Sequence, residues 1–109
     1  MDAYMLIEAE ISDPVQFAEY AQAVPRVVER YGGEYRVVGG MHVPLEGDWG
    51  NTRLVISRWP SVEAAQEFWD SDEYAEVRKL REDTGEFRVM VIEALPEDKV
   101  DRTDEEACQ

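Results

Sequence analysis

The apolar positions at the start of the chain follow a period of two, which is typical of a half-buried β-strand. Over residues 4–11 the side chains form two alternating sets: Met5, Ile7, Ala9 and Ile11 on one side, and Tyr4, Leu6, Glu8 and Glu10 on the other. The first set is apolar throughout, so we expect a strand that packs this set against a core. Glu8 interrupts the second set, and a carboxylate there is costly unless it is paired or lines a wet cavity.

A helical period follows this strand. Apolar positions recur at spacings of three and four along residues 14–31: Phe17, Tyr20, Ala21, Val24, Val27, Val28 and Tyr31. Asp13, Pro14 and Gln16 supply an N-cap, a first-turn proline and a capping-box partner. The pattern predicts a helix with one buried face. Pro25 lies inside it and removes a backbone donor, so we expect a kink or a local break there.

The rest of the chain alternates between strand and helix patterns. It predicts strands over residues 35–43, 53–59 and 87–94, a loop over residues 44–51, and two short helical pieces capped by Ser61 and by Ser71. Gly39 and Gly40 interrupt the second of the four strands. At this pair we expect a bulge or a close approach of another backbone.

The order of these elements predicts the fold class. Strand, helix, strand, strand, helix, strand is the order of the ferredoxin-like α+β fold, a four-stranded antiparallel sheet with its helices on one face. Right-handed crossovers place the first and third strands in the centre and the other two at the edges. We predict one such domain over residues 1–95. The segment after Pro96 has six acids, two bases and no periodicity, so residues 96–109 are predicted to be an acidic disordered tail.

Both sides of the predicted sheet are apolar. The last strand carries Phe87, Val89 and Val91 on one side and Met90 and Ile92 on the other. Two helical regions cover one face, which leaves the second face without cover. The simplest solution is face-to-face packing with a second copy, which predicts a homodimer. The alternative is a monomer with a mildly apolar face, because scattered exposed apolar residues are normal.

Charge and cysteine content narrow the partners and the compartment. Twenty-five acidic and eleven basic residues give a formal net charge of −14, which repels phosphate backbones and anionic lipids. We therefore expect no nucleic-acid partner and no membrane partner, and we attribute most of the charge to solubility. Cys108 is the single cysteine, so no internal disulfide is expected. The start of the chain lacks a secretory-signal pattern, and these features together favour a cytoplasmic protein.

Four segments carry a resemblance to a known family. In chain order they are DPVQFAEY, YGGEYRVVGG, LEGDW and RWPSVEAAQEFWDSDEY. Together they resemble the domain-of-unknown-function 1330 family, with matching positions over about residues 4–94. The resemblance implies a dimeric α/β barrel, in which two ferredoxin-like sheets pack face to face. Relatives in that larger group include cofactor-free oxygenases, isomerases of ring compounds, haem enzymes and proteins with no demonstrated reaction, so the fold is constrained more than the chemistry.

The candidate site centres on His42, the only histidine and the only side chain whose ordinary pKa suits proton transfer near neutral pH. By period two His42 shares a strand face with Arg36 and Val38, unless a bulge at the glycines reverses this. Family members commonly have an arginine where this chain has Val38, so a family anion site cannot be copied onto it. The alternative is that His42 is a structural or exposed residue, as is common for a single histidine without a neighbouring motif.

A second group of candidates lies on and beside the loop. Glu46, which matches the family's glutamate-glycine motif, is expected to act with Trp49 in closing a pocket at the edge of the barrel. Asp48 between them is a weaker candidate, and loop solubility with one packing tryptophan is the alternative. Arg53, at the family's arginine position, is expected either to neutralise a carboxylate or enolate or to form an ion pair with Glu46.

The first strand adds two more candidates. Glu8 is a possible second acid-base group, and Tyr4 is expected to direct its hydroxyl into the same space. Zinc would need two or three further ligands at metal spacing, which one chain does not offer, so we predict no metal site and no cofactor.

These residues favour a small-molecule-binding homodimer. The leading hypothesis is a cofactor-free enzyme of isomerase, lyase or oxygenase type that acts by proton transfer on an apolar or aromatic carbonyl compound. His42, Arg53, Glu46 and Glu8 are the catalytic candidates, and Tyr4, Arg36, Trp49 and Val38 are the substrate-binding candidates. One alternative is a non-catalytic metabolite-binding or accessory protein of a biosynthetic pathway, and another is a purely structural dimer.

Overall fold

The computed structural model describes residues 1–96, and the rest of the predicted tail, residues 97–109, lies outside them. In chain order the elements are β1 (Ala3–Ile11), α1 (Pro14–Arg30), β2 (Glu34–Val38), β3 (Arg53–Trp59), α2 (Val62–Asp70), α3 (Asp72–Arg78), a 3-10 turn (Lys79–Arg81) and β4 (Gly85–Glu93). All six predicted regions of secondary structure are present. The third strand has the predicted bounds, and the others differ from prediction mostly at their ends.

Side-chain caps start the three α-helices where the sequence predicts. The N–H of Gln16 donates to Asp13 Oδ1 over 3.1 Å, that of Ala64 to Ser61 Oγ over 3.0 Å, and that of Tyr74 to Ser71 Oγ over 3.1 Å. Such caps satisfy amide donors that have no partner within the helix. The break expected at Pro25 does not occur, since α1 runs through this residue. Pro25 is exposed, so water can solvate the carbonyl that loses its donor.

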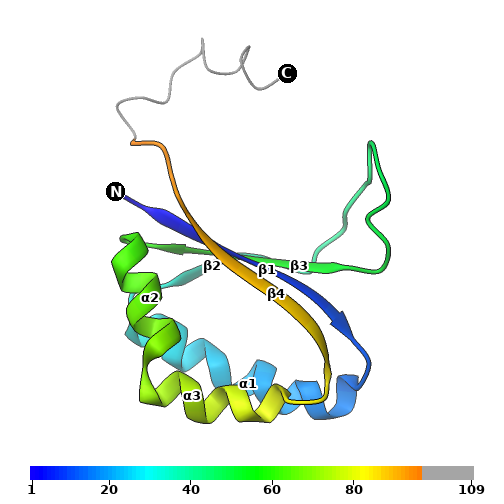
Figure 1. Ribbon diagram of the computed structural model, residues 1–109, viewed down its shortest axis with the longest axis horizontal. Helices are drawn as coiled ribbons and strands as arrows, with labels where there is room; N and C mark the ends of the chain where they lie inside the picture. Colours follow the sequence, from blue (N-terminus) through cyan, green and yellow to red (C-terminus); the bar gives the residue numbers. More distant parts are fainter. Residues whose placement is uncertain (97–109) are drawn as a thin grey trace.

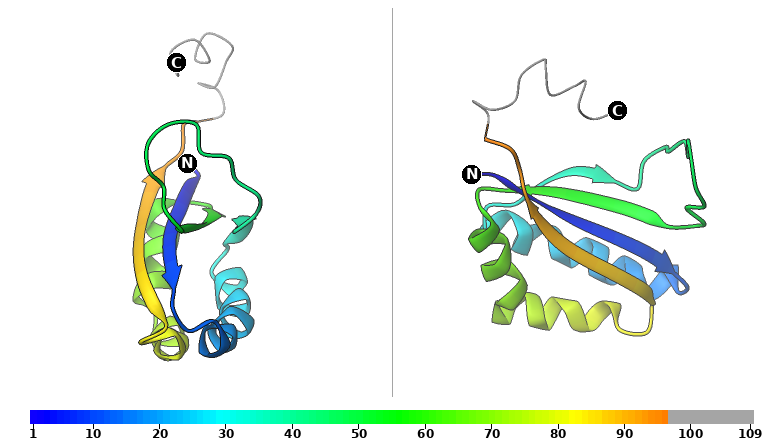
Figure 2. Two further views of the ribbon diagram at one scale, coloured as in Figure 1. Left: turned by 90° about the vertical axis from the view of Figure 1, so that its right-hand side faces the viewer. Right: turned by 45° about the horizontal axis from the view of Figure 1, so that its top comes forward.

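The four strands form one antiparallel sheet in the order β2-β3-β1-β4. The first and third strands are therefore central, as the right-handed crossovers predict. Figures 1 and 2 show all the helices on one face of this sheet. The ferredoxin-like α+β prediction is confirmed. None of the helices within residues 1–96 has the length and apolar character needed to cross a bilayer.

The core lies between the helices and the face of the sheet that they cover. Trp59 is 1% exposed, its ring lies 4.9 Å from that of Phe68, and its Nε1 donates to Ser57 Oγ over 2.9 Å. The buried side chains around it come from every layer of the fold: Met5, Tyr20, Val24, Val27, Val28, Ala65 and Tyr74. Burial of an aromatic side chain stabilises such a core by roughly 1.5–3 kcal/mol. This packing fixes the helices over one face only.

The opposite face of the sheet, called here the open face, has an apolar centre. Leu6 on β1 lies in register between Ile56 on β3 and Met90 on β4. Met90 is 58% exposed and Ile92 is 52% exposed. No element within residues 1–96 covers this face (Figure 2). The apolar pattern that led to the homodimer prediction is therefore present on the surface.

The second strand is shorter than predicted. β2 ends at Val38, and Gly39 then has a φ of +55° that turns the chain out of the strand. Residues 39–52, called here the arm, form a loop that projects on the side of the sheet away from the helices (Figure 1). The irregularity in strand pairing falls between Tyr35 and Val37 rather than at the glycines. His42 consequently lies in the arm and does not share a strand face with Arg36.

Candidate functional site

A cavity of about 390 Å³, called here the inner cavity, lies between α1 and the covered face of the sheet. Most of its lining is apolar and comes from α1 and the three neighbouring strands: Ile7, Ala9, Phe17, Val24, Val55 and Val89. Ala9 lies in register between Arg53 on β3 and Phe87 on β4. Its methyl group fills little of the space between these two larger side chains. The small residue in the central strand thus leaves room beneath the helix.

Three tyrosines line the inner cavity and supply hydroxyl groups. Tyr20 on α1 and Tyr74 on α3 are buried, and their hydroxyl oxygens are hydrogen-bonded at 2.9 Å. Burial raises the pKa of Tyr20 well above its usual value, and the neighbouring Tyr74 raises it further. Burial also raises the pKa of Tyr35 to about 12. The phenols of Tyr20 and Tyr35 therefore stay protonated near neutral pH, where they can donate hydrogen bonds but cannot act as bases.

Two arginines complete the lining of the inner cavity. Arg53 reaches it from β3, and Arg81 reaches it from the turn that precedes β4. The Arg81 guanidinium lies 4.2 Å from the centre of the Phe87 ring and 5.7 Å from that of Tyr20. Arg81 is only 9% exposed, so its charge is held against aromatic faces inside the fold.

A second hollow, called here the outer hollow, has a volume of about 590 Å³. All its lining residues fall within residues 37–54, so a single hairpin with its arm forms it. It brings together four of the predicted site residues: His42, Glu46, Trp49 and Arg53. The Trp49 Nε1 donates to the backbone oxygen of Glu46 over 3.0 Å, which closes a turn over residues 46–49.

His42 has a defined orientation in the outer hollow. Its Nδ1 lies 3.4 Å from the backbone oxygen of Gly40. This contact favours the tautomer with the proton on Nδ1, which leaves Nε2 as the acceptor. His42 is exposed within the chain, like the rest of residues 36–51.

Arg53 lines both the inner cavity and the outer hollow. It packs directly on Gly39, where an added Cβ would lie 2.9 Å from Arg53 Cγ and closer still to Nε. The absence of a side chain at Gly39 thus permits the position of the arginine. Among residues 1–96 no ion pair joins Arg53 to Glu46, so the predicted pairing across the hairpin is wrong. The polypeptide turns outward at Gly39 and carries Glu46 away with the arm.

The remaining predicted site residues lie elsewhere. Glu8 is on the open face, where Arg88 Nε donates to its carboxylate over 2.8 Å, so the carboxylate is paired as its position on the strand requires. Tyr4 is also on the open face. Arg36, on the shortened β2, forms an ion pair with Glu34 at 3.2 Å. Val38 lines the inner cavity and is the member of this group that joins the main site.

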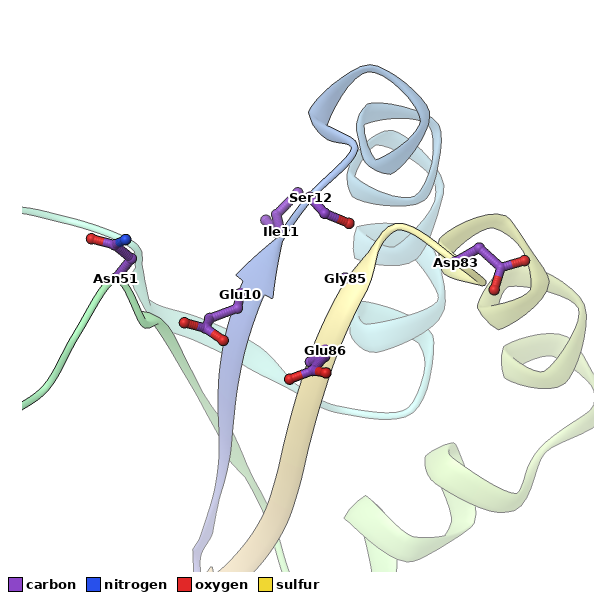
Figure 3. Close-up of a pocket in the computed structure, with 7 residues that line it drawn as sticks. All are labelled: Glu10, Ile11, Ser12, Asn51, Asp83, Gly85 and Glu86. Carbon is purple, nitrogen blue, oxygen red and sulfur yellow. The ribbon is translucent and has the colours of Figure 1, made fainter.

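A third hollow, of about 550 Å³, lies at the end of the sheet where β1 and β4 meet the arm. Figure 3 shows Glu10 and Glu86 on adjacent strands with their carboxylates on the same side. Two like charges in register repel one another, so this hollow is an acidic surface. Within residues 1–96, no three His, Cys, Asp or Glu side chains are grouped so as to hold a metal ion.

Sequence reasoning missed Arg81 and the hydroxyl pair of Tyr20 and Tyr74. A usable signal was present, because Tyr74, Val77 and Arg81 continue one helical stripe at spacings of three and four. A charged residue on an apolar stripe is unusual. Tyr20 lies on the apolar stripe predicted for residues 14–31, and it is buried as expected. Its hydrogen bond to Tyr74 depends on the tertiary approach of α1 and α3.

Comparison with solved structures supports the fold. A protein of unknown function from Rhodopseudomonas palustris is 22% identical, with a TM-score of 0.72 over 87% of this chain and 83% of its own. SnoaB, a cofactor-independent oxygenase from Streptomyces nogalater, is 11% identical, with a TM-score of 0.63 over 87% of this chain and 94% of its own. A dimeric protein of unknown function with a ferredoxin-like fold from Bacteroides fragilis is 14% identical, with a TM-score of 0.57 over 85% and 96%.

Identities this low show a shared fold and carry no reaction across. The chain matches none of the curated proteins. A family model matches residues 2–95, which is nearly the whole of the described chain. The resemblance expected from the four sequence segments is thereby confirmed, and the chain belongs to the family described as Domain of unknown function (DUF1330).

Proposed function

We propose that this protein is a small-molecule-binding homodimer and a cofactor-independent enzyme that acts by proton transfer on an apolar or aromatic carbonyl compound. The inner cavity carries the proposal, because it combines apolar walls with a few hydroxyl and guanidinium groups. Ligand sites in proteins have this composition and volumes of about 300–1,000 Å³. SnoaB, which shares the fold, is described as a cofactor-independent oxygenase, so the fold is compatible with such chemistry.

The binding step uses the apolar walls and the protonated phenols. A planar ring would pack between α1 and the sheet, with apolar contacts supplied by residues such as Val24 and Val89. A carbonyl oxygen of the ligand would accept a hydrogen bond from a neutral phenol or from Arg53. Because burial raises the pKa of Tyr20 and of Tyr35, these phenols remain donors over the whole neutral range.

The proton-transfer step would use Arg53, the residue that the linings of the two hollows share. Breaking a C–H bond next to the carbonyl leaves its electron pair in an enolate, whose oxygen carries the negative charge. The Arg53 guanidinium would stabilise that oxyanion. His42 Nε2 takes the proton, and its return to a different carbon gives an isomer. Glu46 shares the outer hollow and supports the charge of the imidazolium.

The homodimer part of the proposal uses the open face. Its apolar row of Leu6, Ile56 and Met90 is continuous with the outer hollow, since Val37 and Leu54 belong to both the face and the hollow. A second copy packed on this face would bury the row and shield the arm. A dimeric protein from Bacteroides fragilis has the same ferredoxin-like fold, which supports this arrangement.

A second candidate function is a non-catalytic metabolite-binding protein. The inner cavity favours it in one respect, because its lining holds phenol and guanidinium groups but no carboxylate and no imidazole. Catalysis requires His42 to act from the arm, whereas binding requires only the cavity. The two candidates therefore differ in what His42 does.

The binding half can be tested with a panel of aromatic ketones and quinones in a thermal-shift assay. A compound that binds the folded state raises the melting temperature. We expect Val24→Phe to abolish that rise, because the larger ring fills the inner cavity. Val37→Phe is the matched control, since Val37 lines only the outer hollow. The proposal is wrong if no compound stabilises the wild type more than it stabilises Val24→Phe.

The catalytic half can be tested without knowing the product. For a bound ketone, ¹H NMR in D2O follows exchange of the protons next to the carbonyl. We expect the wild type to accelerate this exchange, and His42→Gln to lose at least about 100-fold of the acceleration while its affinity stays within about twofold. Equal exchange by His42→Gln and wild type would leave the non-catalytic binding function as the better account.

A further inference from the structure

The charge of the inner cavity is opposite to that of the chain. The protein has 25 acidic and 11 basic residues, yet the residues that line this cavity include two arginines, Arg53 and Arg81, and no aspartate or glutamate. The acids lie elsewhere, as at the end of the sheet in Figure 3, where Glu10 and Glu86 face solvent. Because acids outnumber bases in the chain, composition alone would favour acids over arginines in the lining of the cavity.

Arg81 is the more informative of the two arginines because it is buried. With 9% of its surface exposed, its guanidinium lies over the rings of Phe87 and Tyr20. Within residues 1–96, no Asp or Glu carboxylate oxygen lies within 4.0 Å of the Arg81 guanidinium nitrogens. It also borders an outer surface that carries Asp70, Glu82 and Asp83, yet it pairs with none of them.

A buried charge without a counter-ion is costly. Ionised side chains inside proteins are normally paired or hydrogen-bonded, because the loss of hydration exceeds what aromatic faces return. Packing alone would be served as well by leucine or methionine at this position. The guanidinium is also the side chain whose planar donors match a carboxylate in two parallel hydrogen bonds. Its counter-ion is therefore to be sought in the cavity that it lines.

We infer that the ligand of the inner cavity is a carboxylate: an apolar or aromatic carbonyl compound whose acidic group is bound by Arg81 while its carbonyl faces Arg53. The inference rests on the proposed use of the inner cavity and adds the charge of the compound. Ala9 separates the two sides, with Arg53 on β3 and Phe87, under Arg81, on β4. These strands are two spacings apart, about 10 Å, so the acid and the carbonyl belong at opposite ends of a ring system.

Pairs of compounds that differ only in charge test the inference. We would compare benzoate with benzamide, and 2-naphthoate and 6-acetyl-2-naphthoate with their amides, by isothermal titration of the full-length chain. We expect each acid to bind at least about tenfold more tightly than its amide, because only the acid neutralises a buried guanidinium. The preference should weaken little with added salt, since a buried pair is poorly screened.

Arg81→Met identifies the anchoring residue. The substitution keeps a flexible apolar stem over Phe87 and removes the charge, so we expect the preference for acid over amide to fall at least about tenfold. Amide binding should change by less than about threefold. Arg78→Met is the matched control, because the Arg78 guanidinium also stacks on an aromatic ring, 4.5 Å from the centre of Trp69, but it does not line the inner cavity. The preference of Arg78→Met for acid over amide should equal that of the wild type.

The outcomes separate this inference from the function on which it rests. Amides that bind as tightly as the acids, with Val24→Phe still blocking both, would refute the carboxylate while the cavity remained the site. An unchanged preference in Arg81→Met would refute the role of Arg81. Failure of every acid and amide to bind would refute both the carboxylate and the proposed use of the cavity.

Discussion

Tyr20 on α1 and Tyr74 on α3 link two helices through their hydroxyl groups, and both residues line the inner cavity. Each hydroxyl is buried and finds its partner in the other at 2.9 Å. Within residues 1–96 every side-chain nitrogen or oxygen that is fully shielded from solvent has a hydrogen-bond partner. The pair therefore depends on both members, and removing one hydroxyl strands the other in an apolar environment.

Tyr20→Phe is expected to lower the free energy of unfolding by about 1–2 kcal/mol, because the Tyr74 hydroxyl is left without its partner. Urea denaturation at neutral pH measures this. In a double-mutant cycle, Tyr20→Phe with Tyr74→Phe should cost less than the two single changes added together. Tyr31→Phe is the control, since no hydrogen bond of the Tyr31 hydroxyl is present within residues 1–96. Additive effects would mean that the two hydroxyls do not act as a pair.

Tyr35 gives a pH-dependent test at the same scale. Burial raises its pKa from 10.0 to about 12, so the folded state holds the phenolic proton more tightly than the unfolded state does. Below pH 10 both states are protonated and the phenol has no pH effect. As the pH rises from about 10 towards 12 the unfolded state ionises first and stability is lost. Tyr35→Phe should therefore show a shallower decline of unfolding free energy in this range, and parallel curves would contradict the shift.

At the scale of elements, the sequence predicts features that depend on neighbouring residues. It does not predict features that depend on the pairing of strands. The caps Asp13, Ser61 and Ser71 and the alternation along β1 are local, and the structure confirms them. Met41 and Val43 continue a strand-like pattern past Gly39, yet both lie in the arm. A strand needs a partner, and the pairing of β2 with β3 extends only to Val38 and the hydrogen bond from Gly39 N to Leu54 O.

The part of the candidate site that lies on one hairpin was predictable from the sequence, whereas the inner cavity was not. His42, Glu46, Trp49 and Arg53 lie close in sequence on one hairpin, and the structure brings them to one hollow. The inner cavity instead draws on α1, α3 and all four strands, so its lining depends on tertiary packing. Arg81 could be suspected only as a charge on an apolar stripe.

The turn into the arm makes a prediction about Gly39. Gly39 and Gly50 have similar positive φ angles, +55° and +57°, so replacing either with alanine carries a similar backbone cost of roughly 1 kcal/mol. Only at Gly39 would the new Cβ meet Arg53, whereas nothing lies within 4 Å at Gly50. We expect Gly39→Ala alone to shift the Arg53 Nε–H signal in ¹⁵N NMR spectra and to slow the proton exchange of a bound ketone. Equal behaviour of the two variants would show that Gly39 does not position Arg53.

At the scale of the whole molecule, the proposed homodimer depends on the open face. Met90 is 58% exposed in the apolar row, and Val15 is 83% exposed on α1. We expect Met90→Asp to raise the dissociation constant of the proposed homodimer by at least about 100-fold, because an unpaired charge would be buried. Val15→Asp makes the same charge change on the helical side and should leave the constant unchanged. Sedimentation equilibrium measures both, and a dimer insensitive to Met90→Asp would place the interface elsewhere.

The net charge of the chain predicts how the proposed homodimer would respond to salt. Each copy carries a formal charge of −14, so two copies repel one another over the screening length, about 30 Å in 10 mM salt and about 8 Å in 150 mM salt. An interface formed by apolar side chains such as Leu6, Ile56 and Met90 gains no attraction that salt could screen. Added salt should therefore tighten the dimer, lowering its dissociation constant at least about threefold between these concentrations. Weakening with salt would instead indicate an interface held by charge pairs, with Arg58 or Arg88 released from Asp2 or Glu8 to bind the other copy.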